Sequence, residues 1–489
     1  MKSELTIIII MGDTMKKVII IGAGVTGLSA GIHALLKGYD VTIYEKNNVC
    51  GGCCGGWFKK NYYIDNCMHW LTGTNQHTKT FKLWKKLGAM DETSNLYQAH
   101  YFYKSELEND FIELNYDVEK VRNDMIRLSP EDRKEIDRFI NTVCCLIKCN
   151  KKESFFNDLF NKTKGFPKAY FRYHKLSLYD LSNKFKHPLL KKVFIDYLPG
   201  CYSSLSLIYA YATFASGNGK LFSEGSLKFS KNIEKRFLSL GGTIHYNFDV
   251  SKINIENNNF NSIVIDGTII RGDILISCID PFYLFDNLVD NNYMPKLLKE
   301  KKAYKDDNPI ISSFQCAYLI DKNKLDFNDT IIFSIPKMEI GTTLIDRVLL
   351  KEYSYLYPNS EKVVIQAFFI QNMKDYDFWN QLKISNLKEY NCLKENIGYT
   401  IMDKLIEKNN SLKDNIILLD TWTPITYNSY FNSYYGSYMG FVFTKKKKMN
   451  KLSPKIANIK NMYYLSYFQK IIGGLPVAAE LGSSITRYL

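Results

Sequence analysis

The sequence predicts an α/β fold in which a buried parallel sheet binds a dinucleotide, and three observations near the N-terminus support this prediction. An apolar run, Val18-Ile19-Ile20-Ile21, has the length and β-branching of a buried parallel strand. A G-x-G-x-x-G turn follows at 22–27 and opens a segment with helical periodicity. A second strand-like run, Asp40 to Tyr44, ends at the carboxylate of Glu45. Strand, turn, helix, strand and acid therefore occur in the order of a dinucleotide-binding βαβ unit.

Each glycine of the turn has a physical role. Gly22 permits the tight turn, Gly24 lets the backbone approach a pyrophosphate, and Gly27 lets the helix pack against the strand. The helix ends at Lys37-Gly38, a usual C-terminal signal, and its N-terminal N–H groups and dipole point at the diphosphate. We expect the whole turn to contact the cofactor: Gly22, Ala23, Gly24, Val25, Thr26 and Gly27.

Glu45 lies where a carboxylate can accept hydrogen bonds from both ribose hydroxyls. Its negative charge disfavours a 2′-phosphate, which argues against NADP. NAD and FAD share this first half of the site, so the discriminating residues lie downstream.

Two glycine pairs, one near each end of the chain, supply that discrimination. Glu45 is followed after five residues by Gly51-Gly52, the spacing of the long flavoprotein fingerprint. A strand-like run at 461–466 precedes a Gly-Gly turn and a helix that begins with Pro near its first turn: Gly473, Gly474, Leu475 and Pro476. The positive end of that helix suits the flavin N1–C2=O edge, where negative charge develops on reduction. Together these stretches resemble the phytoene-desaturase-like branch of the FAD-dependent amine oxidase superfamily.

The resemblance implies FAD as cofactor, in a Rossmann-type domain interleaved with an α+β substrate domain. It adds contacts from Lys46 and from the backbone of Val250, which lies across the adenine in similar proteins. An Arg or Lys commonly follows the first Gly-Gly in that family, but Cys53 stands there in this chain, so we do not carry over that contact. The implied chemistry is hydride transfer between a substrate C–H and flavin N5.

A length of 489 residues suggests two domains. We expect a discontinuous FAD domain at 16–90, 216–284 and 455–489, and a substrate domain at 91–215 and 285–454. The net charge of +14 comes from lysines spread along the chain, so a Lys-rich proteome or attraction to an anionic membrane surface explains it better than nucleic acid. Eleven cysteines without framework spacing indicate thiols in a reducing cytoplasm.

Membrane contact, if present, should be peripheral. Residues 1–15 are too short for a signal or a span, and Met15 is a candidate start. Phe441 to Thr444 precede four lysines at 445–448, which form either a solvated loop or a patch that attracts anionic lipid.

The loop after Gly52 carries the weak catalytic candidates His69 and Trp70. His69 could hydrogen-bond flavin or substrate, or act as an acid or base near pH 7. The alternative is a purely structural histidine, buried and hydrogen-bonded to the backbone. Vicinal Cys53-Cys54 is either redox-active or part of a cramped loop. No metal site is expected, because no second cysteine cluster supplies further ligands.

Elsewhere the chain predicts a largely helical segment at 75–215. Its run at 205–214 is apolar nearly all round and should be a buried helix, either core or the lining of an apolar tunnel. Strand-like runs at 262–265 and 268–270 flank Asp266-Gly267, a strong hairpin signal. Strands alternate with helices over 285–425, including a helix from Leu387 to Lys408.

Three functions remain open. The first is an FAD-dependent desaturase, saturase or isomerase acting on an apolar lipid or isoprenoid. The second is an oxidase of amines or other small molecules on the same fold, which predicts a lysine near N5 and caging tyrosines. The third is a lipid-binding protein without turnover, whose relatives lose the cofactor glycines that this chain keeps. The substrate, the electron acceptor or donor and the oligomeric state are not determined by the sequence.

Overall fold

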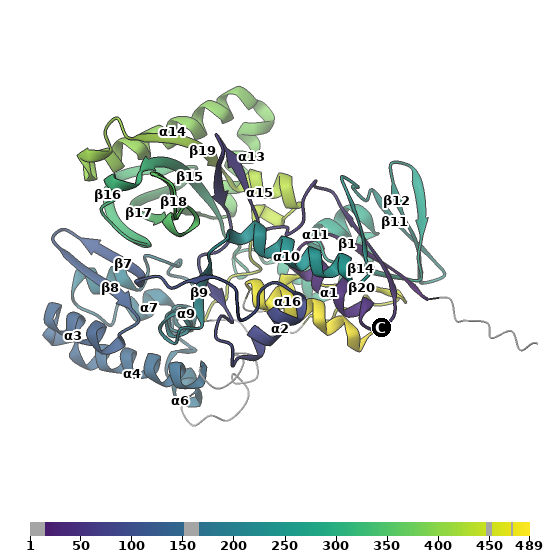
Figure 1. Cartoon of the computed structure of the whole chain (residues 1–489), viewed down its shortest axis with the longest axis horizontal. Helices are drawn as coiled ribbons and strands as arrows, with labels where there is room; N and C mark the ends of the chain where they lie inside the picture. The colour runs from purple at the N-terminus through teal and green to yellow at the C-terminus, as the bar shows by residue number, and fades with distance from the viewer. Residues whose placement is uncertain (1–14, 151–165, 446–451, 471–472) are drawn as a thin grey trace, which may run out of the picture.

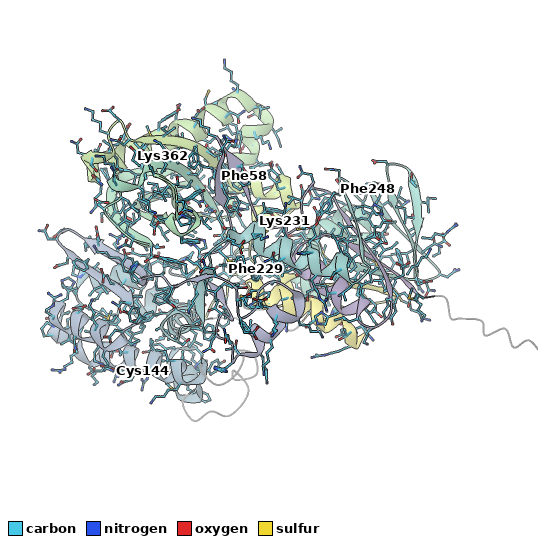
Figure 2. The ribbon with its side chains drawn as sticks, viewed as in Figure 1. Phe58, Cys144, Phe229, Lys231, Phe248 and Lys362 are labelled. Atoms are coloured by element: carbon cyan, nitrogen blue, oxygen red, sulfur yellow. The ribbon has the colours of Figure 1, made fainter. Side chains whose placement is uncertain are left out.

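The protein is described by a computed structural model that covers residues 15–150, 166–445, 452–470 and 473–489. A parallel sheet with its helices lies on one side, and a large mixed sheet and a helical layer lie on the other (Figure 1). The α/β fold predicted from the sequence is confirmed. Phe229, which is fully buried, lies where these parts meet (Figure 2).

The parallel sheet has the strand order β10-β2-β1-β14-β20, and every neighbouring pair is parallel. Its strands are β1 (Lys17–Ile21), β2 (Asp40–Glu45), β10 (Thr243–Tyr246), β14 (Ile274–Ser277) and β20 (Met462–Tyr464). Four helices belong to this part: α1 (Val25–Leu35), α2 (Lys79–Leu87), α10 (Gly225–Ser239) and α16 (Leu475–Ser484). The central strand β1 is buried from Val18 to Ile21, as its continuous apolar run predicts.

A small antiparallel sheet is attached beside the parallel one. It contains β11 (Lys252–Glu256), β12 (Asn259–Ile265) and β13 (Thr268–Arg271). Asp266 and Gly267, with φ of 48° and 77°, form the predicted hairpin turn between β12 and β13. Asn257 and Asn258 also have positive φ and form the tip between β11 and β12, as the asparagine-rich sequence predicts.

The mixed sheet has seven strands in the order β19-β15-β18-β17-β16-β7-β8, and only β16 and β7 pair in parallel. The strands are β7 (Tyr101–Leu107), β8 (Asp110–Asn115), β15 (Ser312–Asp321), β16 (Thr330–Ile340), β17 (Thr343–Glu352), β18 (Lys362–Gln371) and β19 (Ile416–Trp422). Helices α13 (Met373–Ser385) and α14 (Leu387–Lys408) pack on it through buried Trp379 and Ile401, and α15 (Pro424–Phe431) follows β19. The helix predicted from Leu387 to Lys408 is confirmed.

The described residues of the segment 75–215 are mainly helical, as predicted, but they also contribute the β7–β8 hairpin to the mixed sheet. Its other helices are α3 (Val118–Leu128), α4 (Arg133–Asn150), α6 (Phe166–Tyr173), α7 (Leu178–Ser182), α8 (Pro188–Val193) and α9 (Ser204–Ala215). Leu207, Tyr211 and Phe214 of α9 are buried in an aromatic core, so the apolar segment is a buried helix as expected.

Short strands connect the two sides of the molecule. A hairpin of β3 (Gly56–Lys59) and β4 (Tyr62–Asp65) follows the Gly51-Gly52 loop. The strands β5 (Leu71–Thr72) and β6 (Leu96–Tyr97) both pair with β9 (Gly219–Phe222). Two short helices, α11 (Pro281–Tyr283) and α12 (Lys296–Ala303), follow β14.

The boundaries expected for the two domains stay a proposal. The leader at 1–14 and Lys446 to Lys448 lie outside the described residues. Lys445, which is described, forms an ion pair with Asp180. Within the described ranges, none of the helices has both the length and the apolar character that a bilayer span requires.

Candidate cofactor and substrate site

The glycine turn joins β1 to α1 at the carboxyl end of the parallel sheet. Gly22 has a φ of +97°, which a residue with a side chain rarely adopts. A Cβ on Gly27 would lie 2.0 Å from the carbonyl oxygen of Gly22, so only glycine allows this close approach. Helix α1 begins after Gly24 without a side-chain cap and without an acidic residue in its first turn. Its positive end is therefore available to an anion.

The second glycine pair faces this turn. The Gly51 N–H donates to the carbonyl of Ala23 at 2.9 Å, and Gly24 and Gly51 form a parallel bridge. A Cβ built on Gly24 would meet no atom closer than the Gly51 carbonyl oxygen at 3.9 Å. The surface of Gly24 is thus bare backbone beside an uncapped helix end. Such a surface fits the close approach of a diphosphate.

Glu45 is buried beside the turn that it was predicted to serve. One carboxylate oxygen accepts the Ala23 N–H at 2.8 Å, and the other accepts the Asn47 N–H at 2.9 Å. The second oxygen also accepts the Asn47 side-chain amide at 2.9 Å, so the oxygen beside Ala23 is the one that keeps acceptor capacity for a ribose hydroxyl. The Lys46 side chain lies elsewhere: its Nζ donates to the carbonyl of Ser429 at 3.0 Å, and burial lowers its pKa. Any contact of Lys46 with the cofactor would therefore come from its backbone.

Val250 lies between β10 and β11 and is buried. The segment just before Val250 is held against the end of β2, because the Phe248 N–H donates to the Glu45 carbonyl at 2.9 Å. Phe248 itself is visible at the edge of this part of the molecule (Figure 2). The position is compatible with the adenine contact that the resemblance implies.

The C-terminal glycine pair opens a second uncapped helix. Gly474 has a φ of +105° and precedes α16, which has Pro476 in its first turn, no side-chain cap and no acidic residue there. Helix α16 packs directly on α1: the Ser29 hydroxyl donates to the Ala479 carbonyl at 2.7 Å, and a Cβ on Gly482 would lie 2.5 Å from the Thr26 carbonyl oxygen. Two segments more than 400 residues apart in the sequence, one near each terminus, thus form one glycine-lined region.

These residues fit the group that the resemblance implies. Two helix ends without caps, a bare backbone surface at Gly24 and a carboxylate at Glu45 match the diphosphate, the ribose and the electron-rich edge of FAD. When bound, FAD would supply a two-electron hydride acceptor or donor.

His69 and Trp70 lie in an aromatic cluster beyond this region. The His69 ring is 4.9 Å from Phe368 and 6.3 Å from Tyr197, and Trp70 is 5.3 Å from Phe102. His69 keeps some accessible surface, yet its Nδ1 is buried without a hydrogen-bond partner among the described residues. Burial and, less strongly, the Lys351 charge lower its pKa to about 3. The imidazole is therefore neutral near pH 7, which suits hydrogen bonding better than proton cycling.

Lys351 was missed by the sequence reasoning. It lies on β17, is 2% exposed, and its Nζ donates to the carbonyl of Met68 at 2.7 Å. Among the described residues it is the only buried lysine. Burial lowers its pKa to about 8, although the charges of Asp65, Asp329 and Glu352 act in the opposite direction.

Asp280 was also missed. It follows β14 at the carboxyl end of the parallel sheet, accepts the N–H groups of Phe282 at 2.8 Å and Tyr434 at 2.9 Å, and is buried. Burial raises its pKa to about 6. A signal existed in the sequence: an Asp-Pro pair shortly after a buried strand is typical of a helix start.

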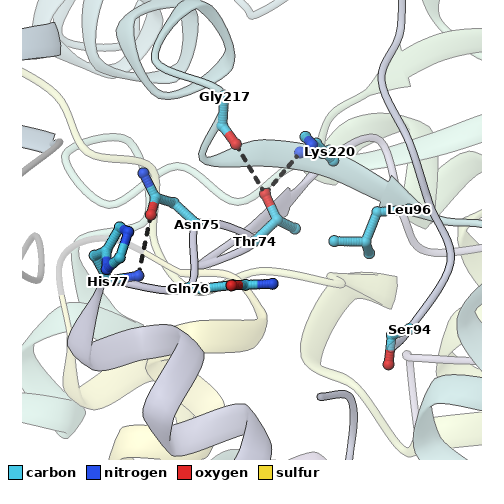
Figure 3. Close-up of a pocket in the computed structure, with 8 residues that line it drawn as sticks. All are labelled: Thr74, Asn75, Gln76, His77, Ser94, Leu96, Gly217 and Lys220. Atoms are coloured by element: carbon cyan, nitrogen blue, oxygen red, sulfur yellow. Dashed lines mark hydrogen bonds between the residues drawn. The ribbon is translucent and has the colours of Figure 1, made fainter. Parts of the chain in front are cut away.

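A polar pocket of about 460 Å³ opens away from the glycine motifs. In Figure 3 the Thr74 hydroxyl lies between the Gly217 carbonyl and the Lys220 N–H, and the Asn75 side chain accepts the His77 N–H. None of the residues predicted to contact the cofactor lines it. The pocket and the glycine-lined region are therefore different features.

Comparisons with known proteins agree with this geometry. Residues 20–87 match the family described as NAD(P)-binding Rossmann-like domain. The chain is 22% identical to a 4,4′-diaponeurosporene oxygenase from Staphylococcus haemolyticus over 96% of both chains, and 22% identical to one from Staphylococcus aureus over 96% of this chain and 97% of that protein. A putrescine oxidase variant has a similar structure, with a TM-score of 0.61 and 12% identity over 97% of this chain and 98% of that chain.

The matches span both ends of the chain and confirm the resemblance drawn from its glycine motifs. Residues 20–87 of this chain therefore match a NAD(P)-binding Rossmann-like domain, and over 96% of its length the chain is a distant relative of the 4,4′-diaponeurosporene oxygenases that shares its fold with a putrescine oxidase.

Proposed function

We propose that this protein is an FAD-dependent oxidoreductase that transfers hydride between a C–H or C=C of an apolar, isoprenoid-like lipid and flavin N5. One observation carries the proposal: the segment that starts at Gly51-Gly52, against the glycine turn, leads through the β3–β4 hairpin to the aromatic cluster at His69 and Trp70. A cofactor held at the first position would thus border an apolar wall at the second. The distant carotenoid-oxidising relatives support this class of substrate.

In this proposal the chain binds and orients the cofactor. Gly24 and the α1 end hold the diphosphate, and Glu45 holds the ribose. If FAD is bound, the positive end of α16 would stabilise negative charge on the reduced ring by roughly 0.3–2 kcal/mol. Gly51 and Gly52, with φ of +107° and +56°, bend the loop so that its backbone lies against the turn.

The substrate would lie along aromatic side chains, which exclude water and fix its orientation. Tyr197 is central, because its ring lies 4.9 Å from Phe102 and 6.2 Å from Trp70. A neutral His69 with an unpartnered Nδ1 can orient a polar end group or the cofactor. Positioning of this kind can supply several kcal/mol of a hydride-transfer barrier.

The second candidate is an oxidase of amines or other small molecules. Buried Lys351 favours this second function, because an amine oxidase is expected to have a lysine close to the flavin. A putrescine oxidase also shares the fold. Tyr353 lies under the Lys351 ammonium, with 4.9 Å between Nζ and the ring centre. A lipid carrier without turnover is disfavoured, because Gly22, Gly24 and Gly27 are retained.

The deciding experiment is an absorption spectrum of the purified protein, followed by acid release and identification of the chromophore. We expect oxidised-flavin bands and released FAD. Anaerobic addition of C30 and C40 polyenes should then bleach the flavin, or reoxidise it after chemical reduction, whereas putrescine should leave it unchanged. A colourless protein that FAD cannot reconstitute would refute the proposal, and oxygen uptake with polyamines would favour the second candidate.

The remaining partners stay proposals of the same kind. Titrating reduced enzyme with oxygen and with a soluble quinone would identify the electron acceptor. Vesicles with and without anionic lipid would test peripheral membrane contact near Lys445. Fractionation of cells that express the chain would test the expected cytoplasmic location.

A further inference from the structure

The hairpin of β3 and β4 places two cysteines opposite each other. Its register pairs Gly56 with Asp65, and the Asn66 N–H donates to the Gly55 carbonyl at 3.0 Å, which continues the ladder by one residue. One more step places Cys54 opposite Cys67. Because the 55/66 pair is hydrogen-bonded, the 54/67 pair falls at a non-hydrogen-bonded position, where opposing Cα atoms are about 4.5 Å apart. A disulfide spans Cα atoms about 4.4–6.8 Å apart.

The side chains agree with this register. Residues 54, 65 and 67 lie on one face of the hairpin, which packs against the start of α10. The Cys54 thiol donates to the Ser226 carbonyl at 3.6 Å, while Asp65 accepts the Ser226 N–H at 2.7 Å. Interaction with the nearby Cys67 thiol, together with burial, raises the pKa of Cys54 well above its usual value.

Accessibility differs between the two thiols. Cys54 is 2% exposed, whereas Cys67 is half-buried and borders the loop that continues to His69. A small oxidant would therefore reach Cys67 first. Among the described residues, no group of three or more His, Cys, Asp or Glu side chains could hold a metal ion.

We propose that Cys54 and Cys67 are a modification site that forms a reversible disulfide across the β3–β4 hairpin. With hydrogen peroxide as oxidant, the Cys67 sulfur attacks one oxygen, the O–O bond breaks, and one water leaves as a sulfenic acid forms. The Cys54 sulfur then displaces the sulfenic hydroxyl as a second water. Two thiols and one peroxide thus give one disulfide and two waters, and a small dithiol restores the thiols by exchange.

The cross-link would fix the loop that separates the cofactor region from the aromatic cluster. Cys67 is followed by Met68, whose carbonyl accepts the Lys351 ammonium. Asp65 already holds the N–H groups of Cys67 and Met68 at 3.0 and 3.2 Å. A disulfide at Cys67 therefore adds a covalent tie at a point where the loop is already anchored, and needs little movement of the backbone.

The test is peptide mapping of the full-length protein, as purified, after treatment with hydrogen peroxide and then with dithiothreitol. We expect the peroxide to remove two alkylatable thiols, a 54–67 cross-linked peptide to appear in non-reducing digests, and dithiothreitol to reverse both changes. Cys53→Ser is the matched control, because Cys53 is adjacent to Cys54 in sequence but lies in the turn at 52–53, outside the β3–β4 register. It should keep the cross-link, whereas Cys54→Ser and Cys67→Ser should each abolish it.

The digest of the wild-type protein can overturn the proposal by itself. The test therefore does not depend on whether the variants fold. Over-oxidation of Cys67 to a sulfinic acid without any cross-link would refute the proposed disulfide between Cys54 and Cys67. So would a linkage of Cys53 to Cys67 or to Cys54, which the Cys53→Ser variant identifies by losing it.

Discussion

The Lys351 ammonium donates to the carbonyl of Met68 at 2.7 Å and thereby joins strand β17 to the loop that carries His69. A second, longer bond of 3.5 Å goes to the carbonyl of His69 itself. Among the described residues no carboxylate pairs directly with this ammonium, and a cation buried with only carbonyl acceptors is costly to keep charged. Because of this cost, Lys351 makes the free energy of unfolding depend on pH.

The first prediction concerns Lys351→Met. Burial lowers the pKa of Lys351 from 10.5 to about 8, so between these values the unfolded chain binds a proton that the folded chain does not. The stability contributed by this group therefore rises with pH through that window. From pH 7 to 9.5 the free energy of unfolding of the wild type should gain roughly 2 kcal/mol relative to the variant.

Urea unfolding at a series of pH values measures this difference. Lys337→Met is the control, because Lys337 is exposed on strand β16 of the same sheet. Its difference from the wild type should stay constant across the window. A constant difference for Lys351→Met as well would mean that Lys351 titrates normally.

The second prediction separates binding from folding within the glycine turn. Gly24 has an ordinary φ of −68°, and a Cβ there meets nothing closer than 3.9 Å, so Gly24→Ala should change the free energy of unfolding by less than about 1 kcal/mol. The added methyl occupies the surface that the diphosphate would approach, so the affinity for FAD should fall about tenfold or more. Flavin retention and fluorescence titration measure this loss.

Gly27→Ala is the matched comparison. Its Cβ would lie 2.0 Å from the Gly22 carbonyl oxygen, so the strand and helix must move apart, which should cost about 1–3 kcal/mol of stability. Equal FAD affinity in Gly24→Ala and the wild type would show that the diphosphate does not approach Gly24.

Local signals explain which parts of the fold could be predicted. The β1–α1–β2 unit, the turn at Asp266-Gly267 and helix α14 are each specified by residues within about 30 positions of one another. The β7–β8 hairpin was not predicted, because its turn at Glu108 has positive φ without a glycine, and its sheet partner β16 begins more than 200 residues later. Non-local pairing of this kind leaves no periodicity in a single sequence.

The same limit applies to the site. The cofactor glycines form a spaced motif and could be recognised, whereas Lys351 closes an apolar strand and reads as an ordinary strand end. Its partner, Met68, is 283 residues away. His69 was singled out by residue type, but its unpartnered Nδ1 and lowered pKa depend on Phe368 and Lys351, which only the folded chain brings near.

The third prediction concerns Asp65, which organises the end of the β3–β4 hairpin. Its carboxylate accepts the N–H groups of Cys67 and Met68 and both the N–H and the hydroxyl of Ser226. Asp65→Ala leaves the N–H groups of Cys67 and Ser226 unpaired, whereas the Met68 N–H keeps its bond to the Ser226 hydroxyl, and should lower the free energy of unfolding by about 3 kcal/mol. Asp91→Ala, in an exposed turn, should cost less than about 1 kcal/mol under the same chemical denaturation.

The fourth prediction concerns His69 during turnover and rests on the proposed function. Burial lowers the pKa of His69 to about 3, so its imidazole stays neutral from pH 5 to 8 and should add no limb to the pH profile of substrate-dependent flavin bleaching. His69→Gln keeps a neutral hydrogen-bonding group and should bleach within about threefold of the wild-type rate. His69→Phe keeps the contact with Phe368 but removes the polar atoms, and should slow bleaching about tenfold, a change of about 1.4 kcal/mol. A limb near pH 6.5 that disappears in His69→Gln would instead identify His69 as a proton carrier, with exposed His77→Gln as the control that should leave the profile unchanged.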